Sequence, residues 1–363
     1  MRTSRASLLS ALRTTVAVVA VAASAVLLTT HPVEAAPATD HPAPPAHRKV
    51  PTTPLDLRDI PTGTPPAIGC GETGPRRTLL HAPDGTTARA PRRVVNAVPL
   101  GDGWVVQVGG RGWPSVRQLL ADGSVRREWQ RTGYGLAVSP EGGAVAFTIK
   151  GGKVRVLDRG GRRVTRMPAV PARWTSPAVV TGDDCRESET STGCAVLVGN
   201  ERGTMSWATS SHGIVDTLPF RSVTTGRGPW VGGYTSFSDE GSCSVMRRGL
   251  RVRWTTCRNS LSAISPDERH VLGLPAYLDG LGPGRLDLLD LRTGQRVRSW
   301  TSSRRDSVVY FDEVWEDADH VLVVTFDGDE TWSVVRLGLD GSLEYAVPPR
   351  RSGEFGPLHL QER

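Results

Sequence analysis

Two kinds of side chain in this sequence could do chemistry: carboxylates that could act in pairs, and tryptophans that lie beside arginines. Two carboxylates on either side of a sugar can hydrolyse a glycosidic bond, one as acid and one as base or nucleophile. Most of the acidic residues stand in turn-like sequence, where they are expected for structural reasons. The candidates for such a pair are Asp239, Glu240, Asp279, Asp312, Glu313, Glu316 and Asp317.

Other catalytic patterns are missing from the sequence. No Gly-x-Ser-x-Gly motif is present, so a serine nucleophile on a sharp turn is not predicted. The acidic run from Asp312 to Asp319 lacks the fixed ligand spacing of a calcium loop. Cys185 and Cys194 lack the Cys-x-x-Cys spacing of a zinc site. We therefore expect no catalytic residue, no metal and no cofactor.

Five tryptophans follow an arginine closely, as in Arg173-Trp174 and Arg227-Gly-Pro-Trp230. Indole faces stack on sugars and guanidinium groups bind carboxylates, so such pairs could hold a glycan or a peptide. Tryptophans beside Pro or a turn are the ones expected at the surface. The predicted ligand contacts are Trp113, Trp174, Trp230, Arg173 and Arg227. The tryptophans expected to pack inside strands are Trp129, Trp207, Trp254, Trp300, Trp315 and Trp332.

The first 35 residues predict export. Three arginines precede an uncharged run from Thr14 to Thr30, and Val33-Glu34-Ala35 offers a small-x-small cleavage site. An uncleaved membrane anchor is the alternative. Without residues 1–35, 41 basic and 36 acidic residues leave a net charge of +5, which is mild, so nucleic-acid binding is not expected. Nine prolines in residues 36–66 predict a linker, and residues 67–363 are predicted to form a single domain.

Two stretches of that domain repeat each other. Leu136-Ala-Val-Ser-Pro-Glu matches Ser262-Ala-Ile-Ser-Pro-Asp, and the equivalent serines are 126 residues apart, three periods of 42. Each copy predicts four short strands, the last two joined by a glycine turn. That glycine recurs at Gly85, Gly123, Gly161, Gly213, Gly249, Gly294 and Gly341. A four-stranded unit about every 40–45 residues is typical of a β-propeller blade.

The Ala-[Val/Ile]-Ser-Pro-[Glu/Asp] motif, followed by an apolar strand and a Leu-Asp pair, resembles the repeats of TolB-like and WD-repeat-like bacterial propellers. This resemblance implies a propeller fold and binding to proteins or envelope components. The Trp-Asp and Gly-His pairs of WD repeats are absent. We predict an all-β propeller with seven blades, leaving six or eight open. The blade holding Thr78 to Leu80 and Thr86 to Arg89 should be completed by a strand near Pro357 to Leu360.

Five cysteines in an exported chain predict two disulfides and one remaining thiol. Cys243 and Cys257 flank a hairpin centred beside Gly249, which would place them opposite each other. Cys185 and Cys194 bracket a polar excursion that a disulfide would hold together. Cys70 is the remaining cysteine.

The sequence therefore predicts an exported β-propeller, secreted or associated with the cell envelope, without a membrane span after signal cleavage. Its expected role is that of a non-enzymatic binding module, a monomer whose partner is an unidentified protein or glycan. The alternative is a glycoside hydrolase or lyase acting on an extracellular polysaccharide.

Overall fold

The computed structural model describes residues 50–66, 70–73, 78–81, 86–91, 93–110, 112–188, 191–200, 203–278, 282–302, 308–327, 329–352 and 357–360. All regular structure in these residues is β, and they contain no helix long and apolar enough to cross a membrane. The predicted signal peptide, residues 1–35, and the first part of the predicted linker lie outside the described residues.

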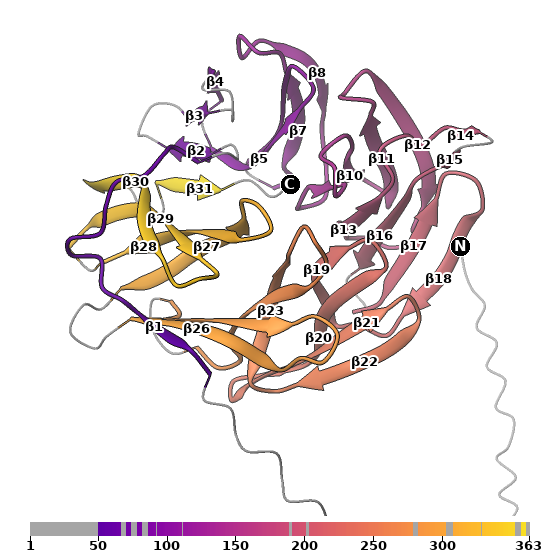
Figure 1. Ribbon diagram of the computed structural model, residues 1–363. Helices are drawn as coiled ribbons and strands as arrows, with labels where there is room; N and C mark the ends of the chain where they lie inside the picture. The colour runs from indigo at the N-terminus through magenta and orange to yellow at the C-terminus, as the bar shows by residue number, and fades with distance from the viewer. Residues whose placement is uncertain are drawn as a thin grey trace, which may run out of the picture. The chain divides into compact units, whose positions relative to one another are not determined.

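Six sheets of four antiparallel strands make up most of the described chain (Figure 1). Four of them use consecutive strands. The first contains β5 (Val94–Leu100), β6 (Gly103–Val108), β7 (Ser115–Leu119) and β8 (Val125–Trp129), and the second contains β9 (Ala137–Val138), β10 (Val145–Ile149), β11 (Lys153–Asp158) and β12 (Arg163–Ala169). The third contains β19 (Ser222–Arg227), β20 (Trp230–Ser238), β21 (Gly241–Arg248) and β22 (Arg251–Thr256), and the fourth contains β27 (Val309–Trp315), β28 (His320–Phe326), β29 (Thr331–Gly338) and β30 (Leu343–Arg351).

The other two four-stranded sheets are interrupted or joined along the chain. One contains β13 (Thr175–Thr181), β16 (Ala195–Asn200), β17 (Met205–Thr209) and β18 (Gly213–Leu218), with the small hairpin of β14 (Glu187–Ser188) and β15 (Ser191–Thr192) inserted after its first strand. The other combines both ends of the domain: β31 (Leu358–Leu360), β2 (Cys70–Thr73), β3 (Thr78–His81) and β4 (Thr87–Ala90). The predicted closure by the C-terminal strand is thus confirmed, since Leu360 is the register partner of Cys70.

The remaining large sheet has five strands. Its four antiparallel strands are β23 (Asn259–Ile264), β24 (His270–Pro275), β25 (Arg285–Asp290) and β26 (Arg296–Ser302), and β1 (Thr52–Leu55) adds to β26 in parallel. The propeller prediction is confirmed, with six four-stranded blades in the described residues. The prediction of seven four-stranded blades is not met, because β1 makes this sheet one strand wider.

Sequence patterns explain which strands lie inside. The second strands are rich in β-branched and other apolar residues and are buried on both faces, as in Val145–Ile149 of β10. The fourth strands β8 and β22 are instead polar and mostly exposed. Apolar side chains of successive sheets meet between them: Leu80 and Ala88 pack with Val106, for example, and Leu358 packs with Leu322. Each sheet is therefore stabilised by its neighbours.

The predicted glycine turns join the third and fourth strands. Gly123, Gly161, Gly213, Gly249, Gly294 and Gly341 all have positive φ, between 57° and 102°, where a side chain would be strained. Gly85 lies outside the described residues. The repeated serine has a structural role: buried Ser265 Oγ accepts the backbone N–H groups of Arg269 and His270, at 3.2 and 2.9 Å. Asp267 Oδ1 also accepts the Arg269 N–H, at 3.1 Å.

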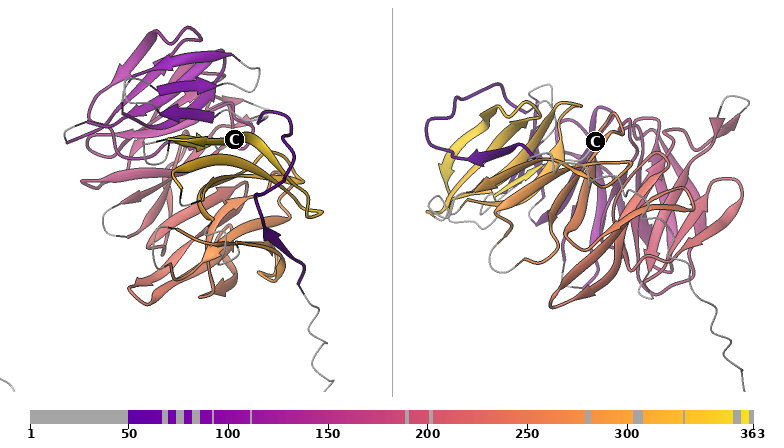
Figure 2. Two further views of the ribbon diagram at one scale, coloured as in Figure 1. Left: turned by 90° about the vertical axis from the view of Figure 1, so that its left-hand side faces the viewer. Right: turned by 60° about the horizontal axis from the view of Figure 1, so that its bottom comes forward.

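Residues 50–66, here called the N-terminal strap, run along the outer edges of two neighbouring sheets (Figures 1 and 2). The backbone N–H of Ser299 donates to Pro51, and that of Tyr345 donates to Pro61. Leu55 is fully buried. This part of the predicted linker therefore contributes to packing, while the domain boundaries at residues 36 and 67 stay predictions.

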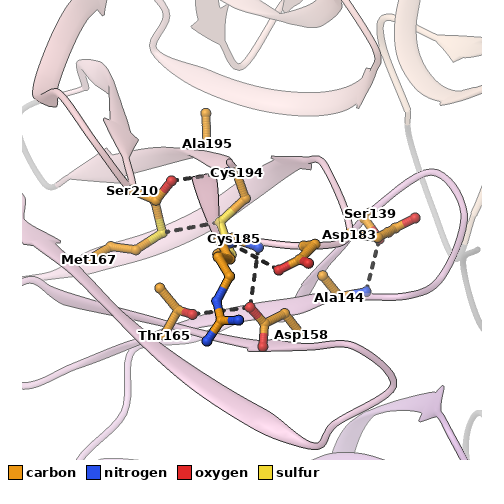
Figure 3. Close-up of a disulfide and its surroundings, with 12 residues drawn as sticks. Ser139, Ala144, Asp158, Thr165, Met167, Asp183, Cys185, Cys194, Ala195 and Ser210 are labelled. Carbon is orange, nitrogen blue, oxygen red and sulfur yellow. Dashed lines mark hydrogen bonds between the residues drawn. A yellow bond between two sulfur atoms is a disulfide. The ribbon is translucent and has the colours of Figure 1, made fainter. Parts of the chain in front are cut away.

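Both predicted disulfide pairs lie at bonding distance in the structure. Cys185 and Cys194 close the base of the β14–β15 insertion, and both side chains are buried beside Met167 (Figure 3). The Cys185 N–H donates to buried Asp158, which also accepts from Thr165 and Arg163. Cys243 and Cys257 join β21 to the end of β22. The hydrogen bonds of Asp158 hold the base of the β14–β15 insertion against β11 and β12 of the preceding sheet.

Candidate functional site

The first strand of each sheet lies innermost, so the ends of these strands define two faces. In an antiparallel sheet, the loops before the first strand and between the second and third strands lie at the same end. We call this end the N face, because the first strands begin there. The opposite end, with the loops after the first strand and between the third and fourth strands, is the C face. Each face has a hollow, and Ala178 and Thr224 line both.

The C-face cavity has a volume of about 880 Å³ and is lined by the ends of the first strands. This volume is within the range of small-ligand sites, about 300–1,000 Å³. Its described lining includes four carboxylates, Asp102, Glu141, Glu316 and Asp317, and one cationic side chain, Arg227. The cavity is therefore predominantly acidic.

Glu316 is committed to an ion pair within the wall of this cavity. It is buried at the end of β27, and its two carboxylate oxygens accept from Nε and Nη2 of Arg336 on β29. Arg336 also donates to Glu344 and to the strap carbonyls of Thr64 and Pro65. The hydrogen bonds from Arg336 to Glu316 are the largest cause of a raised Arg336 pKa, so the guanidinium stays charged. Arg336 thus fastens the strap to the cavity wall.

Asp317 is also engaged, next to Glu316. Partial burial would raise its pKa, but hydrogen bonds from the His320 ring and from the Asp319 and His320 N–H groups leave the pKa below its ordinary value. A carboxyl with a lowered pKa is ionised at neutral pH and is a poor proton donor. Asp317 is therefore unsuited to the acid role in glycoside hydrolysis.

The remaining carboxylates predicted from sequence lie elsewhere. Asp312 accepts the Leu360 N–H at 2.8 Å, and Glu313 accepts the Ser262 hydroxyl at 2.5 Å, so both join neighbouring first strands. Asp239 and Glu240 form the β20–β21 turn, and Asp279 lies outside the described residues. Sequence reasoning missed Asp102 and Glu141 as cavity residues. The signal was present, because each follows a first strand at the position where the repeat turns.

Arg227 and Trp230 behave differently from each other. Arg227 ends β19, and its Nη2 donates to the Pro140 carbonyl of a non-adjacent sheet at 3.1 Å, across the C-face cavity. Trp230 is only 3% exposed, so its prediction as a surface contact is wrong. It begins a second strand and packs against Met246 and Leu261, with the Arg248 guanidinium 5.5 Å from its ring centroid.

The other three predicted contacts come together at the N face. Trp113, in the β6–β7 loop, stacks on Trp174, which precedes β13, with ring centroids 4.0 Å apart and planes 15° apart. The Arg173 guanidinium carbon lies 5.9 Å from the Trp174 ring centroid. Trp174 is 40% exposed and borders the N-face hollow of about 440 Å³. The predicted strand tryptophans do lie within strands.

The N-face hollow differs from the C-face cavity in charge. Its described lining carries Arg221, the amide of Asn200 and the hydroxyls of Ser176, Ser222 and Thr224, with no Asp or Glu. The buried Thr224 Oγ1 has no hydrogen-bond partner among the described residues. Glu201 and Arg202, which follow Asn200, lie outside the described residues.

Basic and aromatic residues continue from the hollow over adjacent N-face loops. Tyr134, in the β8–β9 loop, is 54% exposed. Arg131 is in the same loop, and its carbonyl accepts the N–H of Lys150 in the β10–β11 loop. Thr132 N–H donates to the carbonyl of Pro114, beside Trp113. We call Trp113, Arg131, Tyr134, Lys150, Arg173, Trp174 and Arg221 the aromatic–basic sector.

Comparisons with known proteins add no function. No protein-family model and no curated protein matches the chain. Similar solved structures include that of a eukaryotic initiation factor, with 11% sequence identity and a TM-score of 0.45. The match covers 86% of this chain and 93% of the initiation factor chain. Another is the β-propeller domain of Myceliophteria thermophila Cps50 (Swd1), with 10% identity and a TM-score of 0.43. That match covers 73% of this chain and 90% of the Cps50 domain. A third is KlHsv2 with a replaced loop, with 10% identity and a TM-score of 0.47. That match covers 80% of this chain and 99% of the KlHsv2 chain.

The fold assignment accordingly rests on the sheets themselves. The described residues also contain no group of three or more His, Cys, Asp and Glu side chains placed to hold a metal ion. What the geometry offers is an acidic cavity at one end of the first strands and an aromatic, basic hollow at the other.

Proposed function

We propose that this chain is an exported β-propeller that acts as a non-enzymatic binding module and holds its ligand at the N face. The observation that supports this most is the exposed Trp174, stacked on Trp113 at the rim of a 440 Å³ hollow. A large aromatic surface fixed beside a hollow is typical of binding hot spots. The partner is a protein or a glycan of the cell envelope or the extracellular space, and the protein binds it as a monomer.

The propeller of this proposal has seven blades, the five-stranded sheet being the seventh. Its four antiparallel strands follow the same order as those of the other blades. Its apolar side chains pack on both neighbours, Val271 against Met246 and Trp300 with Val323. β1 is then an added outer strand, and the likeness to TolB-like repeats is clearest in two blades, at residues 136–164 and 262–297.

Export is supported by the two disulfides, because disulfides persist in oxidising compartments. The secreted protein is expected to begin at or near Ala36, after removal of residues 1–35. Intact-mass measurement of the protein from the culture medium tests this. A product that retains Met1 would contradict cleavage and favour the anchored alternative.

Replacing Trp174 with Ala is expected to weaken ligand binding about tenfold or more, since truncating a central aromatic contact has effects of this size. The measurement is capture by the full-length mature protein from envelope and secreted fractions, with bound proteins and glycans identified. Phe237→Ala is the matched control, because Phe237 is 71% exposed on the β20–β21 hairpin and does not line the hollow. Equal binding by both variants would refute the N-face assignment.

The second candidate is a glycoside hydrolase or lyase acting at the C-face cavity. It is favoured by the convergence of Asp102 and Glu141 on one cavity with Glu316 and Asp317. The ion pair of Glu316 and the lowered pKa of Asp317 leave Asp102 and Glu141 as the pair to test. Release of new sugar ends by the wild-type protein, abolished in Glu141→Gln, would establish this activity instead.

A further inference from the structure

We infer that the aromatic–basic sector binds an anionic polysaccharide, one whose sugars carry carboxylate or phosphate groups. This inference rests on the proposed function, which places the ligand at the N face. It goes further by assigning the ligand's chemical class from the side chains that would meet it.

The sugar-binding part of the argument rests on the tryptophan pair. Apolar C–H faces of sugar rings pack on indole rings, and a ring already held in place loses little conformational entropy when it binds. Trp174 is held by the Trp113 stack and still exposes 40% of its surface. Hydroxyls of Ser176 and Ser222 line the same hollow and are suited to hydrogen bonds with sugar hydroxyls.

The anionic part of the argument rests on charge. Arg221 lines the hollow, and Arg173 lies against Trp174, while the described lining contains no carboxylate. Guanidinium groups bind carboxylates and phosphates through two parallel hydrogen bonds. An anionic sugar placed on Trp174 would have cationic partners beside it.

The extent of the sector favours a polymer over a small ligand. The backbone hydrogen bonds from Thr132 to Pro114 and from Lys150 to Arg131 join three adjacent loops. Arg131 and Lys150 therefore lie along one connected edge that leads away from the tryptophan pair. The opposite face is acidic at its cavity, through Asp102 and Glu141 among others, and would repel the same polymer. Binding should thus be confined to the N face.

The test measures retardation of the mature protein in native gels that contain one polymer each. The polymers are polygalacturonate for carboxylates, phosphomannan for phosphates, dextran as a neutral glycan, and single-stranded DNA. We expect retardation by one of the two anionic glycans and little by dextran. The double variant Arg173→Ala/Arg221→Ala should weaken it about tenfold or more, and salt should weaken it in the wild-type protein. Arg269→Ala is the control, since Arg269 is exposed in a C-face turn.

The results distinguish the inference about the ligand class from the proposal that the N face binds the ligand. Preference for polygalacturonate or for phosphomannan identifies the anionic group and supports the inference. Equal retardation by dextran, an unaffected double variant, or stronger retardation by DNA would overturn it. If Trp174→Ala still abolished capture from envelope fractions in that case, the N-face binding function would stand and only the ligand class would be wrong. Thermal unfolding of each variant checks that the fold is retained.

Discussion

Replacing Arg336 with Met is expected to lower the free energy of unfolding by about 3–5 kcal/mol, the usual cost of removing one partner of a buried ion pair. The side chains of Arg336 and Glu316 are only 9% and 4% exposed. Without the guanidinium, the Glu316 carboxylate would stay buried and lose the two hydrogen bonds that it accepts from Arg336. The strap carbonyls of Thr64 and Pro65 would lose their donor in the same substitution.

Urea unfolding followed by tryptophan fluorescence measures this change. The double variant Arg336→Met/Glu316→Leu separates a lost ion pair from lost packing, because it removes the stranded charge as well. It should be substantially more stable than Arg336→Met alone. Arg269→Met, which breaks an exposed pair with Asp267, should cost about 0–1 kcal/mol. A loss below about 1 kcal/mol in Arg336→Met would show that this ion pair does not hold the strap.

The parts of the fold that sequence predicted are those determined by local patterns. A glycine turn needs only a few residues to be recognised, and its recurrence identified the third and fourth strands of successive sheets. Cys243 and Cys257 were paired because a hairpin places them opposite each other. The closing strand, Leu358–Leu360, followed from counting strands in the first unit.

The N-terminal strap could not be predicted in this way. High proline content favours an extended, hydrated chain, and nothing in residues 50–66 alternates strongly enough to indicate a strand. β1 exists because the edge of β26 offers unpaired backbone groups and because Leu55 enters an apolar cluster with Leu286 and Trp300. Both causes lie more than 200 residues away along the chain.

The candidate site was predicted in composition and only partly in arrangement. Arg173 and Trp174 were singled out together, but Trp113 lies 61 residues earlier, and only the winding of the sheets stacks it on Trp174. Trp230 lies beside Pro229, as Trp113 lies beside Pro114. Trp230 is nevertheless buried, because it occupies a second strand whose side chains point between sheets. Proximity to proline thus predicted exposure poorly. Position along the sheet separates Trp174, which precedes a first strand, from Trp230, which begins a second strand.

Replacing Leu55 with Ala is expected to destabilise the protein by about 2–5 kcal/mol, as for other fully buried leucines, although Leu55 lies in a proline-rich stretch. Truncation leaves a cavity among Leu286, Val308 and Trp300 that the parallel pairing of β1 with β26 prevents from closing. Thr52→Ala, an exposed position on the same strand, should change stability by less than about 0.5 kcal/mol.

The same urea titration measures both strap variants. If residues 50–66 were only a linker, Leu55→Ala and Thr52→Ala would unfold at the wild-type urea concentration, and the strap would have no part in stability. A shift confined to Leu55→Ala would instead mean that the fold requires the strap. The Arg336 substitution would then act on the same unit from its other end. Combining Leu55→Ala with Arg336→Met should cost less than the sum of the two, because each already loosens the strap.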